Sequence, residues 1–367
     1  MLSTQLAVKT LEEIATEVKR CAEIGKRILP IGNGTKTRLS VASADVQSIS
    51  LSAWSGIVEY QPFEFTITAK SGTRIEDIQR ELESQGQYLP FDPIFMRQGS
   101  TLGGTIATGV SGPGRLLFGG IRDFVLGVQF IDGLGEVVRG GGKVVKNAAG
   151  FDLPKLMVGS LGRLGVLSEV TLKVFPKPIG YRTFKLEART FSNALNQISS
   201  LMLLPVDVVA VELSSDRSVF VRVAGDEATT KKLIARIREH LGISHVEQWG
   251  GEEELAWWRG AAELEWAKDA DLLVRVPLTM PDLESLERRL EGIGAKRWYS
   301  AAINAAWIAV NGGADKRELL DKLLCELNLK GLVLRGDGEL MIGRDATQAF
   351  ARRIQNAIDP SQVFVPF

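Results

Sequence analysis

Apolar residues near the start of the chain recur with the spacing of one helical face. The segment 10–24 has four of them, namely Leu11, Ile14, Val18 and Cys21. Thr10 with Glu13 three positions later is typical of a capping box, which satisfies free N–H groups at a helix start. We therefore expect a helix over residues 10–24 that ends at Gly25.

Shorter apolar runs follow and predict an alternation of strands and helices in the first half. Strands are expected at residues 27–31, 57–60 and 65–69, and a helix at 75–85. The strand 27–31 leads directly into Gly32, Asn33 and Gly34. This exit from a strand into a glycine loop is the first candidate phosphate contact.

Glycines are concentrated in residues 99–165, where they alternate with Leu, Ile, Val and Phe. Two segments show this, GSTLGGTIATGVSGPG at 99–114 and VGSLGRLGVLSEVTLKV at 158–174. A flexible linker would instead contain Ser and other polar residues. Because glycine has no Cβ, it allows the main chain to approach a ligand closely. The pattern favours a large, flat or phosphorylated ligand that lies against the backbone.

The second half of the chain repeats one order of elements twice. The order is β-α-β-β-α-β, typical of a ferredoxin-like unit, with a further helix expected at 251–266 between the copies. The first copy is expected at residues 182–186, 191–203, 206–213, 218–223, 227–241 and 245–248. The second is expected at residues 272–276, 281–290, 296–302, 305–310, 315–327 and 331–335. Pro176 and Pro178 mark the border before the repeats.

Composition limits the classes of function. The chain has 367 residues, 45% of them hydrophobic and 24% charged, which suits about two globular domains. Lys and Arg together number 44, as do Asp and Glu, so no net charge favours nucleic acid or an anionic membrane. No apolar run has the length of a membrane-spanning helix, and the start resembles no signal peptide. We expect a cytoplasmic protein.

The two cysteines, Cys21 and Cys325, lie far apart in the sequence. They offer no disulfide framework and fewer thiolates than an iron-sulfur cluster usually requires. Any such cluster in the system must therefore be carried by a partner protein.

The sequence matches neither of two common nucleotide-binding motifs. The pattern G-x-G-x-x-G starts at Gly32 and Gly34 but has Thr37 in its last position, and no Walker A sequence occurs. Two loops, 31–36 and 99–104, are candidate backbone nests for a pyrophosphate, although each alone is more typical of an ordinary turn.

Four ordered segments carry a family resemblance. They are PIGNGT at 30–35, the glycine segment 99–114, the long segment 121–160 that includes KNAAGFDLPKL, and LGRLGVLSEVTLKVFPKP at 161–178. Together they resemble FAD-linked oxidases of the vanillyl-alcohol oxidase type, with a PCMH-type flavin domain. Within that family they look most like the FAD-binding subunit of bacterial glycolate oxidase, a relative of D-lactate dehydrogenases and alkyldihydroxyacetonephosphate synthases.

The resemblance implies an α+β fold in three parts. Residues 1–178 would form a PCMH-type FAD-binding domain, residues 179–340 a cap of two ferredoxin-like repeats, and residues 341–367 a segment that returns to the FAD domain. It also implies the cofactor contacts. Pyrophosphate, ribityl and flavin-ring contacts would come from Ile31, Gly32, Asn33, Gly34, Thr35, Lys36, Gly99, Ser100, Gly103, Gly104, Thr108, Ser111 and Gly112, and from Gly165 and Val166, with a side chain at 165 expected to collide with the cofactor.

Two departures from the family pattern matter. Some members attach FAD covalently to a His after the first phosphate loop, but here Lys36 and Thr37 follow that loop and the flavin domain has no His. We expect non-covalent FAD. The family's usual chain end is also missing, because this chain ends on Val365, Pro366 and Phe367.

The catalytic base is not evident from the sequence. Oxidation of a 2-hydroxy acid needs a base, a hydride acceptor and a cation for the carboxylate. The two histidines, His240 and His245, fall in the cap and are equally typical of surface or packing positions. Candidate cations are Lys146, whose alternative role is an ion pair with Asp152, and Arg275, whose alternative is a position on the rim.

The predicted function is an FAD-binding subunit of a glycolate or D-lactate oxidising complex that passes electrons to an iron-sulfur partner. The complex would also hold a catalytic flavoprotein paralogue and would associate at most peripherally with a membrane. Two alternatives stay open. One is a non-catalytic subunit that supports the paralogue, and the other is a free-standing FAD-dependent oxidase. The several tryptophans indicate an aromatic pocket, a partner surface or core packing.

Overall fold

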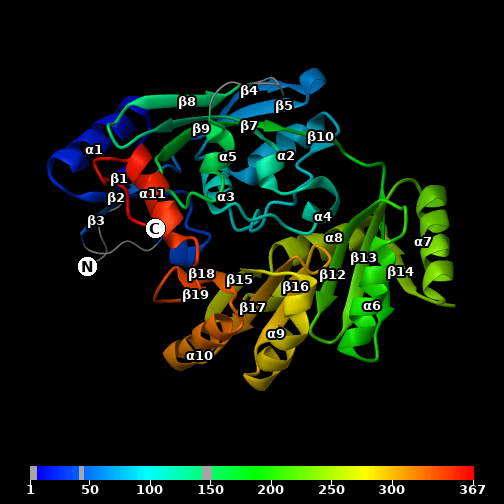
Figure 1. The fold of residues 1–367 in the computed structure, drawn as a ribbon. Helices are drawn as coiled ribbons and strands as arrows, with labels where there is room; N and C mark the ends of the chain where they lie inside the picture. The colour runs from blue at the N-terminus through cyan, green and yellow to red at the C-terminus, as the bar shows by residue number, and fades with distance from the viewer. Residues whose placement is uncertain (1–5, 41–44, 143–150) are drawn as a thin grey trace. The chain divides into compact units, whose positions relative to one another are not determined.

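The computed structural model describes residues 6–40, 45–142 and 151–367. The chain divides into two compact units (Figure 1). Unit 1 comprises Met1–Ser111, Gly120–Lys177 and Ala346–Phe367, and unit 2 comprises Gly112–Gly119 and Pro178–Asp345.

Unit 1 contains the elements of the first half together with the last helix. Its elements are β1 (Leu6–Ala7), α1 (Leu11–Glu23), β2 (Arg27–Ile31), η1 (Thr37–Ser40), β3 (Val46–Ser50), β4 (Ile57–Gln61), η2 (Pro62–Glu64), β5 (Thr66–Lys70), α2 (Ile75–Ser84), β6 (Gln87–Tyr88), α3 (Leu102–Thr108), η3 (Ile121–Asp123), β7 (Val125–Ile131), β8 (Val137–Gly141), α5 (Leu153–Met157), β9 (Val166–Lys173), β10 (Phe175–Pro176) and α11 (Gln348–Ile358).

Three sheets organise unit 1. Strands β1, β3 and β2 form a parallel sheet in that order, and β4, β5, β9, β7 and β8 form an antiparallel sheet. Strands β6 and β10 form a short antiparallel pair. The capping box expected for α1 is confirmed, because Thr10 Oγ1 accepts from the N–H of Glu13 at 3.1 Å and Glu13 accepts from the N–H of Thr10 at 3.3 Å.

The last residues of the chain pack into unit 1. The N–H of Ile28 on β2 donates to the carbonyl of Val363 at 2.7 Å, and Phe364 is buried in the same core as α1. The carboxylate of Asp359 accepts from the N–H groups of Val363 and Phe364. Burial raises the pKa of Asp359, while these backbone donors oppose the change.

Unit 2 is built on one nine-stranded sheet. Its elements are α4 (Arg115–Phe118), β11 (Tyr181–Glu187), α6 (Phe191–Met202), β12 (Val208–Ser214), β13 (Ser218–Ala224), α7 (Glu227–Leu241), β14 (Glu247–Gly250), α8 (Gly251–Ala262), η4 (Glu265–Ala267), β15 (Leu272–Pro277), α9 (Met280–Gly292), β16 (Lys296–Ser300), β17 (Ala305–Val310), α10 (Gly313–Glu326), β18 (Lys330–Arg335) and β19 (Met341–Gly343).

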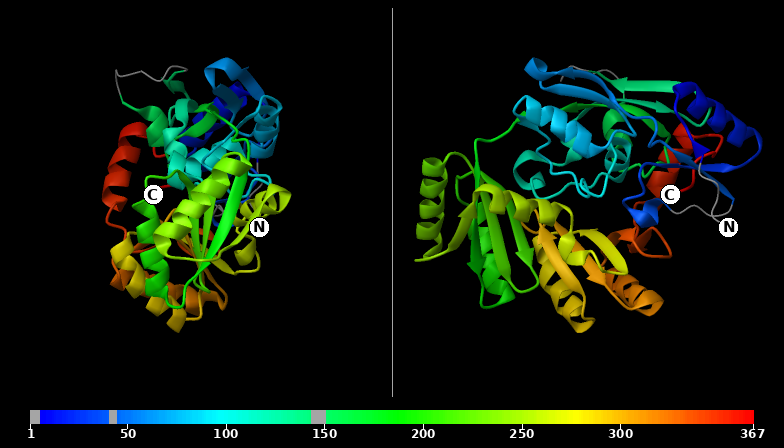
Figure 2. Two further views of the ribbon diagram at one scale, coloured as in Figure 1. Left: turned by 90° about the vertical axis from the view of Figure 1, so that its right-hand side faces the viewer. Right: turned by 180° about the vertical axis from the view of Figure 1, so that it is seen from behind.

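The strand order of this sheet is β14-β11-β13-β12-β16-β17-β15-β18-β19. It is two four-stranded β-α-β-β-α-β units joined edge to edge where β12 pairs with β16, with β19 added at one end. The hydrophobic core lies between the sheet and helices α6, α7, α9 and α10, which cover one face (Figure 2). Helix α8 packs against β11 and β14. The predicted α+β class with two ferredoxin-like repeats is confirmed.

Several borders differ from those expected. The helix expected over 251–266 ends at Ala262, because Leu264 adopts a left-handed conformation with φ of 52° before η4. Residues 341–345 stay with unit 2, since β19 pairs with β18. The segment 112–119 also groups with unit 2, because Leu116 packs against its hydrophobic core.

Candidate cofactor site

A cleft opens in unit 1 between the loop after β2 and the helix α3. Its lining residues are Pro30, Ile31, Gly32, Asn33, Gly34, Thr35, Lys36, Leu39, Thr101, Gly104, Ala107, Thr108, Leu161 and Gly162. The two loops that the sequence singled out as phosphate nests therefore meet at one cavity.

Two contacts fix the distance between these loops. The side-chain amide of Asn33 donates to the carbonyl of Gly99 at 2.8 Å. A Cβ placed on Gly32 would lie 2.1 Å from Oγ1 of Thr101, so only glycine allows this approach. Gly34 has a φ of 69°, the left-handed region that favours glycine. The loop thus depends on glycine at both positions.

Lys36 supplies positive charge inside the cleft. The residue is only 5% exposed, and its Nζ lies 3.5 Å from Oγ1 of Thr35 and 5.6 Å from the centre of the Phe95 ring. A buried ammonium beside backbone N–H groups is a suitable partner for phosphate oxygens.

Two buried hydroxyl groups near the cleft have no hydrogen-bond partner in the described part of the chain. Oγ of Ser100, next to the lining residue Thr101, and Oγ of Ser160, next to Leu161, are buried without a hydrogen-bond partner among the described residues. Buried polar atoms are nearly always satisfied in folded proteins. Together with Lys36 and the glycine loop, these orphaned groups fit a phosphorylated ligand with further hydrogen-bonding atoms.

The structure divides the residues implied by the resemblance into two groups. Eight line the cleft, namely Ile31, Gly32, Asn33, Gly34, Thr35, Lys36, Gly104 and Thr108. Seven do not, namely Gly99, Ser100, Gly103, Ser111, Gly112, Gly165 and Val166. The sequence analysis did not identify Leu161 and Gly162 as lining residues. Both belong to the segment 161–178 that carries the resemblance, and Leu161 directly follows Ser160.

Gly165 is constrained by the protein itself, a constraint that the sequence did not indicate. A Cβ at this position would lie 2.7 Å from Cδ2 of Phe130 and 2.8 Å from the carbonyl oxygen of Ile131, and its φ is 151°. Gly103 is similar, because a Cβ there would lie 2.7 Å from Cβ of Ser71. The hydroxyl group of Ser111 also has a partner within the protein, since its Oγ accepts a hydrogen bond from the N–H of Ile121 at 2.9 Å.

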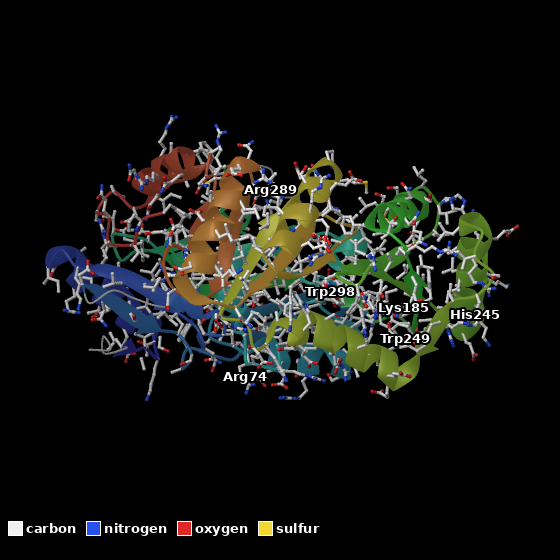
Figure 3. All side chains as sticks on the ribbon, turned by 90° about the horizontal axis from the view of Figure 1, so that it is seen from below. Arg74, Lys185, His245, Trp249, Arg289 and Trp298 are labelled. Atoms are coloured by element: carbon white, nitrogen blue, oxygen red, sulfur yellow. The ribbon has the colours of Figure 1, made fainter. Side chains whose placement is uncertain are left out.

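Neither candidate base is among the described residues that line the cleft. Lys146 falls outside the described residues, and Asp152, its alternative partner, caps α5 and pairs with Lys155 at 3.0 Å. His240 and His245 are both exposed in unit 2, and His245 is labelled in Figure 3.

Most tryptophans form one aromatic cluster in unit 2. The rings of Trp257, Trp298 and Phe220 lie 4.4 to 6.1 Å apart between centroids, and Trp266 stacks on Trp298 at 6.1 Å. Trp249 joins them from β14 (Figure 3). These rings therefore pack against one another within the unit.

The comparison with protein families decides the class of ligand. Residues 5–141 match the model of the FAD binding domain. The predicted resemblance and the predicted cofactor, FAD, are thereby confirmed. The first phosphate loop and α3 both fall inside this FAD-binding domain, so all the residues that line the cleft except Leu161 and Gly162 lie within the matched range.

The chain is similar to several oxidoreductases. It is 40% identical over 185 residues to glycolate oxidase subunit GlcE of Escherichia coli, covering 50% of this chain and 52% of that protein. It is 30% identical over 217 residues to glycolate oxidase subunit GlcD of Bacillus subtilis, covering 59% of this chain and 46% of that protein. It is 34% identical over 170 residues to a D-lactate dehydrogenase of Anaerostipes hadrus, covering 46% of this chain and 35% of that protein. The matches thus span about half or less of these relatives.

A solved structure of alkyldihydroxyacetonephosphate synthase has the same fold. Its TM-score is 0.69 at 16% identity, and the match covers 99% of this chain and 75% of that one. Among the described residues, no helix combines the length and apolar character required to cross a membrane.

Proposed function

We propose that this chain is the FAD-binding subunit of a complex that oxidises glycolate or D-lactate to the corresponding 2-oxo acid. The observation that carries this proposal is the glycine-lined cleft with buried Lys36 inside a matched FAD-binding domain. The similarity to two glycolate oxidase subunits and to a D-lactate dehydrogenase supports the substrate class.

In this proposal each part of the chain has a separate task. FAD, when bound, supplies the hydride acceptor for the carbon that bears the hydroxyl group. The N–H groups of residues 31–36 and the ammonium of Lys36 would hold the pyrophosphate, and binding would be non-covalent. Thr108 would help to orient the cofactor, since it lines the cleft while donating to the carbonyl of Gly104 at 2.8 Å.

The remaining predicted contacts belong to the same proposal. Gly99, Ser100, Gly103, Ser111, Gly112 and Val166 would lie beyond the cleft, toward the ribityl chain and the ring, and Gly165 would support them through its packing on β7. Lys146 and Arg275 would be the cations that attract the acid. Electrons would leave through an iron-sulfur partner, because two cysteines are too few for a cluster in this chain.

One observation favours a second function, a non-catalytic subunit that stabilises a catalytic flavoprotein paralogue. Lys36 is the sole titratable side chain among the described residues that line the cleft, and both histidines are exposed. A proton acceptor for the hydroxyl group would then come from the paralogue. A free-standing oxidase that uses O₂ is the third arrangement.

Anaerobic reduction of the purified chain tests these functions. The flavin is first quantified by absorbance after acid precipitation, which releases a non-covalent cofactor. Glycolate or D-lactate is then added, and bleaching of the flavin band supports the enzyme. A chain that carries flavin but bleaches only when its paralogue is present supports the non-catalytic subunit. Bleaching followed by rapid return of colour in air, without a partner, supports the free oxidase.

A further inference from the structure

The turn at residues 160–163 forms part of the cofactor cleft and has an unfavourable backbone conformation. Leu161 and Gly162 both line the cleft, and both have positive φ, of 56° and 71°. A residue with a side chain keeps a left-handed conformation only where its surroundings enforce it. A Cβ on Gly162 would lie 3.2 Å from Cδ of Pro30, so the turn lies directly against another lining residue. The shape of the cleft therefore depends on contacts that hold this turn.

The side chain of Gln355, on α11, binds the last residue of the turn. Gln355 is only 6% exposed. Its Nε2 donates to the carbonyl oxygens of Arg163 and Val365, at 3.0 Å in both cases. Its Oε1 accepts from the N–H of Phe367 at 3.3 Å, and the Phe367 ring centre lies 5.6 Å from the guanidinium carbon of Arg163. One buried amide thus joins the cleft turn to residues 359–367, which we call the tail.

The same tail pairs with β2, the strand that leads into the glycine loop of the cleft. The N–H of Val365 donates to the carbonyl of Ile28 at 3.2 Å, and the N–H of Ile28 donates to the carbonyl of Val363 at 2.7 Å. Strand β2 ends at Ile31, which lines the cleft. The tail is therefore linked to two separate parts of the lining, to the glycine loop through β2 and to the turn 160–163 through Gln355.

Asp359 anchors the start of the tail on a third segment of unit 1. Its buried carboxylate accepts from the N–H groups of Val363 and Phe364 at 3.1 and 2.9 Å. A Cβ on Gly133, in the turn between β7 and β8, would lie 2.1 Å from Oδ1 of Asp359. Oγ of Ser361 donates to the carbonyl of Gly133 at 3.0 Å. These contacts hold the tail in one position relative to the core of unit 1.

We propose that Gln355 is a positioning residue that couples the tail to FAD binding in the cleft. Gln355 is not among the residues that line the cleft, so it acts through the turn that it holds. A binding site keeps its geometry only where a surrounding layer of hydrogen bonds fixes the groups that touch the ligand. Loss of the Gln355 amide removes a donor from the carbonyls of Arg163 and Val365 and lets the turn relax. The inference rests on the proposed function of the cleft as the FAD site.

Coupling between the tail and FAD must act in both directions. If attachment of the tail raises the affinity for FAD, bound FAD stabilises the attached tail by the same factor. The N–H groups of Val365 and Phe367 report on this attachment, because each donates a hydrogen bond that holds the tail in place. Their hydrogen exchange should therefore slow when FAD binds.

The first experiment compares Gln355→Met with Gln87→Met in the full chain. Methionine has a similar length and loses the hydrogen bonds of the amide. Gln87 is a matched control, because it is also a buried amide of unit 1 and does not line the cleft. It donates to the carbonyl of Pro62 at 2.8 Å and accepts from the hydroxyl of Tyr60 at 3.0 Å. FAD affinity is measured by titrating the apoprotein and following flavin fluorescence, and stability by thermal unfolding without FAD.

Both variants are expected to unfold at a lower temperature than the wild type, because each loses buried hydrogen bonds. Only Gln355→Met is expected to bind FAD more weakly, by about tenfold. Equal FAD affinity in the two variants would mean that Gln355 supports only the fold, and the positioning role would be rejected.

The second experiment follows hydrogen exchange by mass spectrometry with and without FAD. It starts from the wild type, so its result does not depend on whether a variant folds. Exchange of the tail peptide 359–367 is expected to slow several-fold with FAD, while the peptide 57–65, which belongs to β4 and η2 and does not line the cleft, changes less. In Gln355→Met the effect of FAD on the tail peptide should be largely lost. Tail exchange that FAD leaves unchanged in the wild type would overturn the coupling.

The same preparations separate this inference from the proposed function. Flavin reduction by glycolate and D-lactate is measured alongside FAD affinity. Weaker FAD binding in Gln355→Met, in a chain whose flavin neither acid reduces, would retain the positioning role and reject the proposed oxidation. Reduction of the flavin together with an unchanged FAD affinity in Gln355→Met would retain the oxidation and reject the positioning role. A wild-type chain that binds no FAD would overturn both.

Discussion

Asn33 and Gly99 are joined by a side-chain to backbone hydrogen bond of 2.8 Å although 66 positions separate them in the sequence. The bond connects the loop after β2 to the turn before α3. Residues of both segments line the cleft in unit 1. The spacing of the proposed cofactor site therefore depends on this amide together with the close approach of Gly32 to Thr101.

Replacing Asn33 by Ala is expected to loosen the cleft. Loss of the hydrogen bond should reduce the free energy of unfolding by about 1 kcal/mol and weaken FAD binding by roughly tenfold. FAD affinity is measured by titrating the apoprotein and following flavin fluorescence. Asn196→Ala, an exposed asparagine of α6, is the control. Unchanged FAD affinity in Asn33→Ala would show that the loops hold their spacing without this bond.

Valine at Gly104 and at Gly165 should have different effects. Gly104 lines the cleft, and a Cβ there would meet only Oγ1 of Thr101 at 3.1 Å, so Gly104→Val should fold but lose its flavin. Gly165→Val should lose roughly 2 kcal/mol or more of stability, because the side chain would collide with Phe130 in a strained backbone conformation. Urea unfolding and flavin content distinguish the two. A stable, colourless Gly165→Val would mean instead that position 165 acts on the cofactor.

Substituting Lys36 by Met tests whether its charge holds phosphate. The variant keeps the length and apolar stem of the side chain, so the fold should persist while FAD affinity falls by about tenfold. The dependence of FAD affinity on salt should also weaken, since one cation is removed. Lys9→Met, an exposed position in the same unit, is the control. If FAD affinity and its salt dependence match those of the control, the phosphates lie elsewhere.

The two thiols should react differently with alkylating reagents. Cys21 is fully buried, and burial, followed by the nearby Glu17 carboxylate, raises the pKa of its thiol to about 11. At pH 8 only about 0.1% of it would be thiolate, the reactive form, and that fraction should grow as the pH approaches 11. Mass spectrometry after iodoacetamide treatment at pH 8 should therefore find the label on exposed Cys325. Labelling of Cys21 to the same extent as Cys325 in the folded chain would contradict the buried position of the Cys21 side chain.

The sequence alone was sufficient for the features that depend on local pattern. Helical spacing and the Thr10 capping box identified α1, and the repeated order of strands and helices identified the two ferredoxin-like units of the cap. The glycine loops and their resemblance to a flavin domain indicated FAD. These features are encoded by neighbouring residues, so they can be recognised without knowing which segments meet.

Only the tertiary structure decided the features that depend on distant residues. It brought Asn33 to Gly99 and Leu161 to the cleft, and it showed that Gly165 is required by Phe130. It also joined the two repeats into one sheet through β12 and β16 and, among the described residues, left Nε of Arg275 buried without a hydrogen-bond partner. Contact between remote segments is fixed by how whole elements pack and by which charges that packing compensates, and neither can be derived from local spacing.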